Sequence, residues 1–413
     1  MVVSINLFIC LLRLDWMGIK LPSSRVKITK KKMKDTLFES LEEQGYLILG
    51  DQIRPPVLTS KEDIRRLHHQ QKRTRHMEDI KLFKEYGKYL INAYFANGVE
   101  IDPEKFRPEL IPVSSNDWTG RLFRIATLLW SVPVSKGYGR RMRFLVMDRS
   151  NGKLAGIIAL GDPVFNLKVR DDYIGWNAQD RKERLFNVMD AYVLGAIPPY
   201  NQLLVGKYLA GVLSTNEVRG YFGGKYKDKQ TIIQGKSKPA DLVLITTTSA
   251  LGKSSVYNRV YFDKGESRRL LLKKIGFTAG FGHFHVSEEV FRLMRQFLSE
   301  RDEKYADGHE FGNGPNWRMR VIKKTMEILG YSRTPVLQHG IKREVFISPL
   351  ATNFKEYLKG ETSKPEFLFL PFQEYTEYFK TRFLIPRFHR RPEIRLHLAQ
   401  DLYLNLLNDF DRV

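Results

Sequence analysis

The chain of 413 residues is longer than one average domain, and its 42% apolar and 28% charged residues exclude both a disordered tail and a disulfide scaffold. The single cysteine, Cys10, excludes an intrachain disulfide and a cysteine-based zinc site, and it favours a reducing, cytoplasmic compartment. Lysine and arginine outnumber aspartate and glutamate by 68 to 46, so the formal charge of +22 predicts a polyanionic partner, nucleic acid first of all.

Residues 1–32 are expected to form an extension that is disordered or is translated from upstream of the biological start. The apolar run from Val2 to Leu12 is too short to span a membrane and lacks the basic flank of a signal peptide. A basic arm follows it, with Met17 or Met33 as the candidate start. We therefore expect no membrane association.

Residues 33–135 predict a mostly helical, basic region. A short amphipathic helix is expected from Asp35 to Gly45, and Ser60 can cap a longer helix that runs to Asp79. One face of this longer helix is basic and carries Arg65, Arg66, Lys72, Arg73 and Arg75. Such faces are often merely solvated, but the charge of the whole chain favours contact with phosphate.

Residues 136–300 change to a pattern that is typical of an α/β core. Two apolar runs, Arg143–Met147 and Leu154–Leu160, are joined around Asn151-Gly152 and predict a hairpin inside a covered sheet. Further elements are expected as a strand at Val188–Ile197, a helix at Gln202–Leu213, a strand at Leu242–Thr246 and one or two strands within Phe277–Val286.

Two insertions interrupt this core, and a helix and strand extension at 301–413 follows it. The segment Asp162–Arg184 contains Trp176. This tryptophan is a candidate to stack on a nucleic-acid base, although a tryptophan in such a position is more often part of the core. The segment Gly220–Lys238 predicts a basic loop that includes Lys225 and Lys227 as nucleic-acid contacts.

The densest polar constellation follows the strand at Leu242–Thr246 and continues to Arg259. Gly252-Lys253-Ser254 invites comparison with a phosphate-binding P-loop, but Thr247 stands where that loop requires glycine. We expect the candidate catalytic residues here to be Ser254, Tyr257, Asn258 and Arg259. Tyrosine can donate a proton or stack, asparagine can recognise an amide-like edge, and arginine can bind phosphate. The alternative is a helix start whose polar groups satisfy their own backbone.

Two further candidates are a histidine pair and a strand-to-helix passage. His283 and His285 would share one face of a strand, as catalytic or hydrogen-bonding residues, although no third metal ligand is evident. Gln202, Gly206 and Lys207 lie where a helix N-terminus could hold the pyrophosphate of acyl-coenzyme A. The cofactor nevertheless stays unknown, because Val205 replaces the glycine of the usual acetyltransferase turn.

Several separated motifs together resemble the DruA family of Druantia anti-phage defence, over about Met33 to Gly360. They are Gly161-Asp162-Pro163, the segments 170–176, 246–249, 254–259 and 276–285, and Pro349-Leu350-Ala351-Thr352-Asn353. The resemblance implies a cytoplasmic bacterial defence component, encoded beside a helicase-like partner that would supply any ATP use. It also implies a core similar to the GNAT class, with a mixed central sheet flanked by helices.

Three functions follow as alternatives. The first is a defence component that binds nucleic acid, DNA before RNA, through a basic surface and modifies or senses phage DNA. The second is a coenzyme A-dependent acyltransferase acting on a nucleobase or a protein. The third is a metal-dependent nuclease or transposase-like enzyme that would use Asp162, Asp171, Asp172, His283 and His285. Whether the chain is an enzyme stays open at this point.

Overall fold

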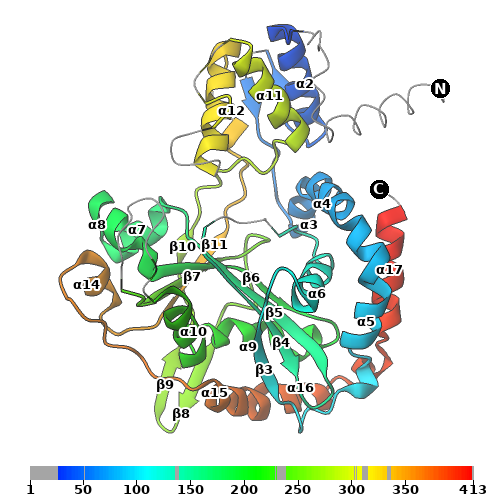
Figure 1. Ribbon diagram of the computed structural model, residues 1–413, viewed down its shortest axis with the longest axis vertical. Helices are drawn as coiled ribbons and strands as arrows, with labels where there is room; N and C mark the ends of the chain where they lie inside the picture. The colour runs from blue at the N-terminus through cyan, green and yellow to red at the C-terminus, as the bar shows by residue number, and fades with distance from the viewer. Residues whose placement is uncertain are drawn as a thin grey trace. The chain divides into compact units, whose positions relative to one another are not determined.

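The computed structural model describes residues 27–50, 52–134, 139–227, 229, 239–301, 303, 305–308, 315–332 and 336–411. They belong to two compact units (Figure 1). The small unit comes from Met1–Ser40 and Glu288–Arg333, and the large unit comes from Leu41–Ser287 and Thr334–Val413. The domain bounds expected from the sequence stay a prediction.

The small unit is helical. It contains the first part of α2 (Lys30–Glu42), together with α11 (Glu288–Ser299) and α12 (Pro315–Leu329). The apolar stripe of α11 is buried and consists of Val290, Phe291, Met294, Phe297 and Leu298. Ile28 is also buried, its amide donates to Glu300 Oε2 at 2.6 Å, and its carbonyl accepts from Arg301 at 3.0 Å. The expectation of a disordered extension is therefore corrected for residues 27–32, whereas residues 1–26 lie outside the described ranges.

Two truncated chains can test whether residues 27–32 contribute to stability while residues 1–26 do not. Removal of residues 1–26 is expected to leave the thermal melting of the small unit unchanged. A chain that starts at Met33 loses the buried Ile28 and the first turn of α2. Its free energy of unfolding should fall by roughly 2–4 kcal/mol, because a buried aliphatic side chain leaves an unfilled core. Identical melting and amide exchange of the two truncated chains would contradict this.

A mixed seven-stranded sheet forms the centre of the large unit, which confirms the expected α/β class with a mixed sheet flanked by helices. Among the described strands only β6 and β7 pair in parallel. The hairpin of β4 and β5 is also confirmed, with Gly152 at φ 71° in its turn. In spatial order the strands are β10 (Lys273–Phe277), β11 (Glu344–Pro349), β7 (Leu244–Thr248), β6 (Val188–Ala196), β5 (Lys153–Gly161), β4 (Arg141–Asp148) and β3 (Pro108–Pro112).

Helices cover both faces of this sheet, as Figure 1 shows. Successive side chains of each strand point to opposite faces, so the same strands contribute to two separate cores. Phe144 and Val146 of β4 belong to the core that includes α9 (Val205–Val212) and α15 (Phe372–Phe379). Leu145 belongs to the opposite core, which includes residues of the helices α5 (Lys88–Tyr94), α6 (Trp118–Thr127) and α17 (Ala399–Asp411).

The other elements lie around this sheet. They are β1 (Leu47–Leu49), β2 (Gln52–Arg54), α3 (Lys61–Leu67), α4 (His69–Leu82), α7 (Lys168–Ile174), α8 (Ala178–Arg184), α10 (Asn216–Tyr226), β8 (Tyr261–Lys264), β9 (Ser267–Leu270), α14 (Phe354–Lys359) and α16 (Ile385–His389). Within the described ranges, no helix is long and apolar enough to cross a membrane.

Three local expectations are corrected. Phe277–Val286 is not a strand beyond the end of β10: Gly276, at φ 147°, lies at a bulge within β10, and Gly280, at φ 73°, turns the chain after it. The segment 254–259 is a loop and not a helix. The part of Gly220–Lys238 up to Tyr226 continues α10 instead of forming a loop, and residues 228 and 230–238 lie outside the described ranges.

Candidate functional site

The two central strands β6 and β7 separate soon after they meet. Their pairing covers three residue pairs and ends at Asp190 and Thr246, although β6 continues to Ala196. At the same place β6 carries a bulge, with Tyr192 as the extra residue opposite β5. The Thr247 hydroxyl donates to the Ala191 carbonyl at 2.8 Å. Bulges and unpaired strand edges inside a sheet are common next to binding sites.

Asp190 and Thr246 form a polar pair at this separation, on the face of the sheet opposite to the core against which Tyr257 packs. The Thr246 hydroxyl donates to Asp190 Oδ1 at 2.6 Å, and burial raises the pKa of this half-buried carboxyl. Burial also raises the pKa of Tyr257 to about 12, with a smaller rise from nearby Asp190, while the Thr247 side chain acts to lower it. The Tyr257 ring packs edge-on against Phe346 at 5.5 Å. The predicted tyrosine therefore packs into the core on one face of the sheet, and Asp190 on the other face is an acid that the sequence analysis did not single out.

The predicted cofactor residues adjoin the predicted catalytic loop. Lys207 Nζ of α9 donates to the carbonyls of Asn258 at 2.6 Å and Arg259 at 3.4 Å. Burial and the charge of Arg259 lower the pKa of Lys207. Two non-glycine residues near Lys207 adopt left-handed backbone, Leu204 at φ 64° and Arg259 at φ 57°. Such strain costs on the order of 1–3 kcal/mol per residue and often accompanies function.

The remaining residues of the strand-to-helix passage have backbone contacts. The Gln202 carbonyl accepts from Arg387 Nε at 3.1 Å. A Cβ added to Gly206 would lie 3.4 Å from Val256, so the loop closely covers the start of α9. The structure thus brings together the two regions that the sequence analysis proposed separately.

Ser254 and Asn258 hold the shape of this loop. The Ser254 amide donates to Glu344 Oε2 at 2.8 Å, and its hydroxyl accepts from the Tyr257 amide at 3.2 Å. Asn258 Nδ2 donates to the Ser254 carbonyl at 2.7 Å, and Lys274 Nζ donates to Glu344 Oε1 at 2.6 Å. For Ser254 and Asn258, these local bonds match the alternative in which the polar groups satisfy their own backbone.

His283 and His285 do not share a strand face, because the segment that contains them is irregular. His285 is buried, bonds to the Val336 carbonyl and stacks on Tyr46 at 5.4 Å, whereas His283 is half-buried. No three His, Cys, Asp or Glu side chains among the described residues are placed to hold a metal ion. The metal-dependent alternative therefore gains no support from these residues.

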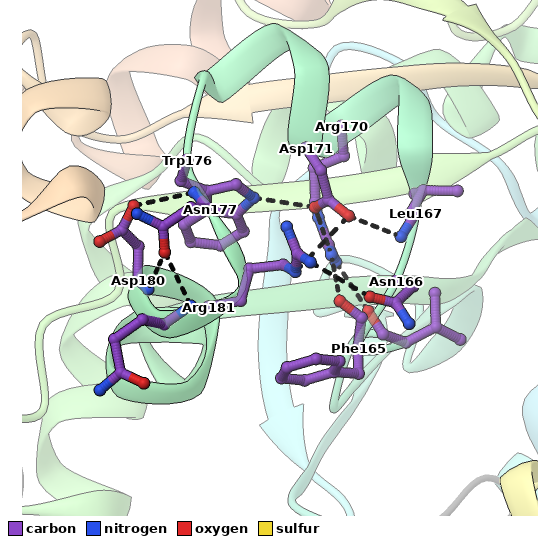
Figure 2. Close-up of polar contacts among 11 residues, drawn as sticks. Phe165, Asn166, Leu167, Arg170, Asp171, Trp176, Asn177, Asp180 and Arg181 are labelled. Carbon is purple, nitrogen blue, oxygen red and sulfur yellow. Dashed lines mark hydrogen bonds and ion pairs between the residues drawn. The ribbon is translucent and has the colours of Figure 1, made fainter.

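A buried ion pair occupies the insertion between β5 and β6 (Figure 2). Asp171 accepts hydrogen bonds from Arg170 Nε at 2.8 Å, from Trp176 Nε1 at 2.9 Å and from the Leu167 amide at 2.9 Å. Arg170 is fully buried and also donates to the carbonyls of Val164 and Phe165, both at 2.9 Å. Trp176 is 5% exposed, so it is a core residue with no surface for a base.

The other two carboxylates of the metal alternative are also paired. Asp162 binds Arg140 Nη2 at 2.7 Å, and Asp172 binds Lys168 at 2.7 Å on the surface of α7. Each of the three aspartates thus has its own cation.

The predicted basic face of α3 and α4 is largely neutralised within the protein. Arg65 binds Glu62 at 2.8 Å, Arg66 binds Asp63, and Lys72 binds Asp409 at 2.6 Å. Arg75 binds Glu78 at 3.1 Å and Asp79 at 3.0 Å, while Arg73 is exposed. Internal carboxylates compete with phosphate for these cations, so this face is weaker for a polyanion than its sequence suggests.

A second basic surface gathers at the end of α10 and the start of β4. This α10 basic cluster consists of Arg143, Lys225, Lys227 and Lys229, and none of its members has a carboxylate partner among the described residues. Burial lowers the pKa of Lys225, and the charges of Lys229 and Arg143 lower it further. Lys225 Nζ lies 5.6 Å from the centre of the Tyr221 ring, and Lys229 Nζ lies 6.0 Å from that of Tyr226. Like charges beside aromatic rings are typical of surfaces that bind nucleic acid.

Comparisons with known proteins give one consistent result. Residues 59–360 match the family described as Druantia protein DruA. A curated relative with the same description, from Escherichia coli (strain UMEA 4076-1), is 44% identical over 385 residues, which cover 93% of this chain and 94% of the relative. No solved structure is significantly similar. The matched range includes both the β6 and β7 separation and the α10 basic cluster.

Proposed function

The chain belongs to the DruA family, and from this membership we propose that it is a cytoplasmic component of anti-phage defence that binds nucleic acid, DNA before RNA, through the α10 basic cluster. A helicase-like partner encoded alongside would supply any ATP hydrolysis, because Thr247 replaces the glycine that a P-loop needs.

The observation that carries this proposal is the gathering of cations that have no carboxylate partner in the described part of the chain, although Lys225 donates to the Arg141 carbonyl and Arg143 donates to the Ser115 hydroxyl. Holding Lys225 near Lys229 and Arg143 costs free energy, as the lowered pKa of Lys225 indicates. A phosphate backbone would offset that cost, since each bound cation releases a condensed counterion from the nucleic acid. Tyr221 and Tyr226 lie next to these cations and are half-buried against the core, which fixes the end of α10 that carries them.

Binding to labelled duplex and single-stranded DNA is therefore expected to fall steeply with salt. Replacing Lys225, Lys227 and Lys229 together with Gln should reduce the slope of log affinity against log salt by about 2 to 3, because roughly 0.9 counterion is released per phosphate contact on duplex DNA. Fluorescence anisotropy between about 50 and 200 mM salt measures this slope.

A matched control replaces three internally paired cations, Arg65, Arg66 and Lys72, with Gln. Its salt slope should change by less than about 1. A flat salt response of the wild-type chain, no binding to DNA or RNA, or an equal effect of the two triple variants would reject the α10 basic cluster as the binding surface.

The second candidate function is a GNAT-like acyltransferase that uses acyl-coenzyme A. The specific observation in its favour is the edge of β6 beyond Asp190, which has no strand partner on the β7 side among the described residues. An amide-containing ligand arm can pair with such an edge as an added strand would. Lys207 at the start of α9 would then face its phosphates. Calorimetric titration with coenzyme A tests this, and wild-type affinity of Lys207→Gln, or no binding at all, would argue against it.

A further inference from the structure

We infer that Asp190 is the proton-accepting residue of a reaction site at the point where β6 and β7 separate. The substrate would be a molecule that presents an amine, amide or hydroxyl group with an exchangeable proton. This inference goes beyond nucleic-acid binding and does not depend on it. It assigns a chemical role to a residue on the central sheet that is not part of the α10 basic cluster.

The geometry gives Asp190 one fixed oxygen and one available oxygen. Thr246 donates to Oδ1 at 2.6 Å and fixes the orientation of the carboxyl group. Among the described residues, Oδ2 has no hydrogen-bond or ion-pair partner, and the side chain keeps part of its surface accessible. Because β7 pairs with β6 no further than this residue, the next strand does not cover the position beyond it.

Two other interior carboxylates of the large unit have a cation, whereas the fully buried Asp148 is held by the amides of Arg107 and Ser150 and by the Tyr200 hydroxyl. Asp171 is bound by Arg170 at 2.7 Å, and Glu344 is bound by Lys274 at 2.6 Å. Arg170 also acts electrostatically on Asp190, but its donors are already engaged by Asp171 and two carbonyls. Asp190 differs from all three in having a single hydrogen-bond donor, and a partly buried carboxyl that is so little satisfied is a candidate for a chemical task.

The orientation that the Thr246 hydroxyl gives to the Asp190 carboxyl suits proton transfer, because one oxygen is held and the other is available to a substrate. As a carboxylate, Asp190 would accept the proton of a substrate N–H or O–H bond, and the electron pair of that bond would stay on the substrate atom. Protonated Asp190 would then return its proton to water. Thr246 would hold the carboxyl group in a fixed orientation during this transfer.

Asp190→Asn tests this role because asparagine keeps the shape and the acceptor for Thr246 but cannot accept a proton. Cells that carry the complete defence system with this variant should lose protection in phage plating by about 100-fold or more, the usual contribution of a general base. The affinity of the purified variant for DNA should not change, so a failure of nucleic-acid binding and a failure of this inference give different results.

Thermal melting at several pH values provides the second measurement. Because burial raises the pKa of Asp190 in the folded chain, its stabilising contribution is complete below the unfolded pKa of about 3.9 and is lost as the pH rises through the folded value. The Asn variant should therefore melt at the same temperature as the wild type near pH 4 and at a higher temperature at neutral pH.

Thr246→Val is the matched control, since it removes the hydroxyl that orients the carboxyl but keeps the carboxyl itself. It should keep more protection than Asp190→Asn even if it melts at a lower temperature. Wild-type protection by Asp190→Asn, or a loss of melting temperature together with protection, would assign Asp190 a structural role and overturn the inference.

Discussion

Replacement of Arg170 with Met is expected to lower the free energy of unfolding of the large unit by about 3–5 kcal/mol, because it leaves a buried carboxylate with only the more distant Arg181, at 3.8 Å, as its cation. Arg170 is fully buried, and Asp171 would keep only the Trp176 and Leu167 donors. The carbonyls of Val164 and Phe165 would lose a donor as well. Methionine has a similar length, so the change removes charge and hydrogen bonds more than volume.

The same helix offers a control. Lys168 and Asp172 on α7 form an ion pair at 2.7 Å, but their side chains are 86% and 62% exposed. Lys168→Met should therefore cost less than about 1 kcal/mol. Urea unfolding of both variants measures the difference, and equal destabilisation would show that the buried pair has no special weight.

Replacement of Glu344 with Gln is expected to destabilise the large unit by about 2 kcal/mol and to loosen the loop that carries Tyr257. The carboxylate accepts from Lys274 and from the Ser254 amide, which together hold the loop against β11. Protection from phage should fall with it, since the orientation of Tyr257 depends on Ser254.

The effect of Glu344 should depend on pH. Burial alone would raise its pKa, but hydrogen bonds from Lys274 and Ser254 and the charges of Lys274 and Lys253 outweigh burial and lower the pKa. The stabilising contribution is therefore complete above the unfolded pKa of about 4.3 and is lost as the pH falls through the folded value. Melting of wild type and variant should converge in acid.

Glu374→Gln serves as its control, because Glu374 binds Lys264 at 2.7 Å on a surface where the lysine is 71% exposed. This variant should melt like the wild type at all pH values. A large effect of Glu374→Gln, or a difference for Glu344→Gln that persists in acid, would contradict the assignment.

Much of the central sheet could be predicted from the sequence because its strands are long, apolar runs joined by a clear turn. Asn151-Gly152 indicated the β4 and β5 hairpin, and the apolar run from Val188 indicated β6. The segment Phe277–Val286 misled the prediction, because its alternating aromatic residues resemble a strand, whereas Gly280 adopts left-handed backbone and ends the extended conformation soon after β10.

The candidate site was only partly predictable. Tyr257 and Arg259 were singled out from a run of polar residues, but Asp190 lies inside an apolar strand and the only signal was one acid where the pattern calls for an apolar residue. The end of the β6 and β7 pairing depends on contacts between residues far apart in the sequence, which local periodicity does not report. The same limit applies to the basic face of α4. Lys72 forms an ion pair with Asp409, which lies far away in the sequence, so the sequence alone shows no sign that this lysine is neutralised.

The order in which the chain is synthesised matters for these two units. The small unit needs α2 and α11, which are separated by roughly 250 residues, so at about 5–20 residues per second α2 waits on the order of 12–50 s for its partner. β11 lies between β7 and β10 but is made after α12. Neither unit can therefore close until roughly four fifths of the chain has been synthesised. The apolar face of α2 stays exposed to chaperones during its wait, and the edge of β7 waits for β11 over about 100 residues, or on the order of 5–20 s.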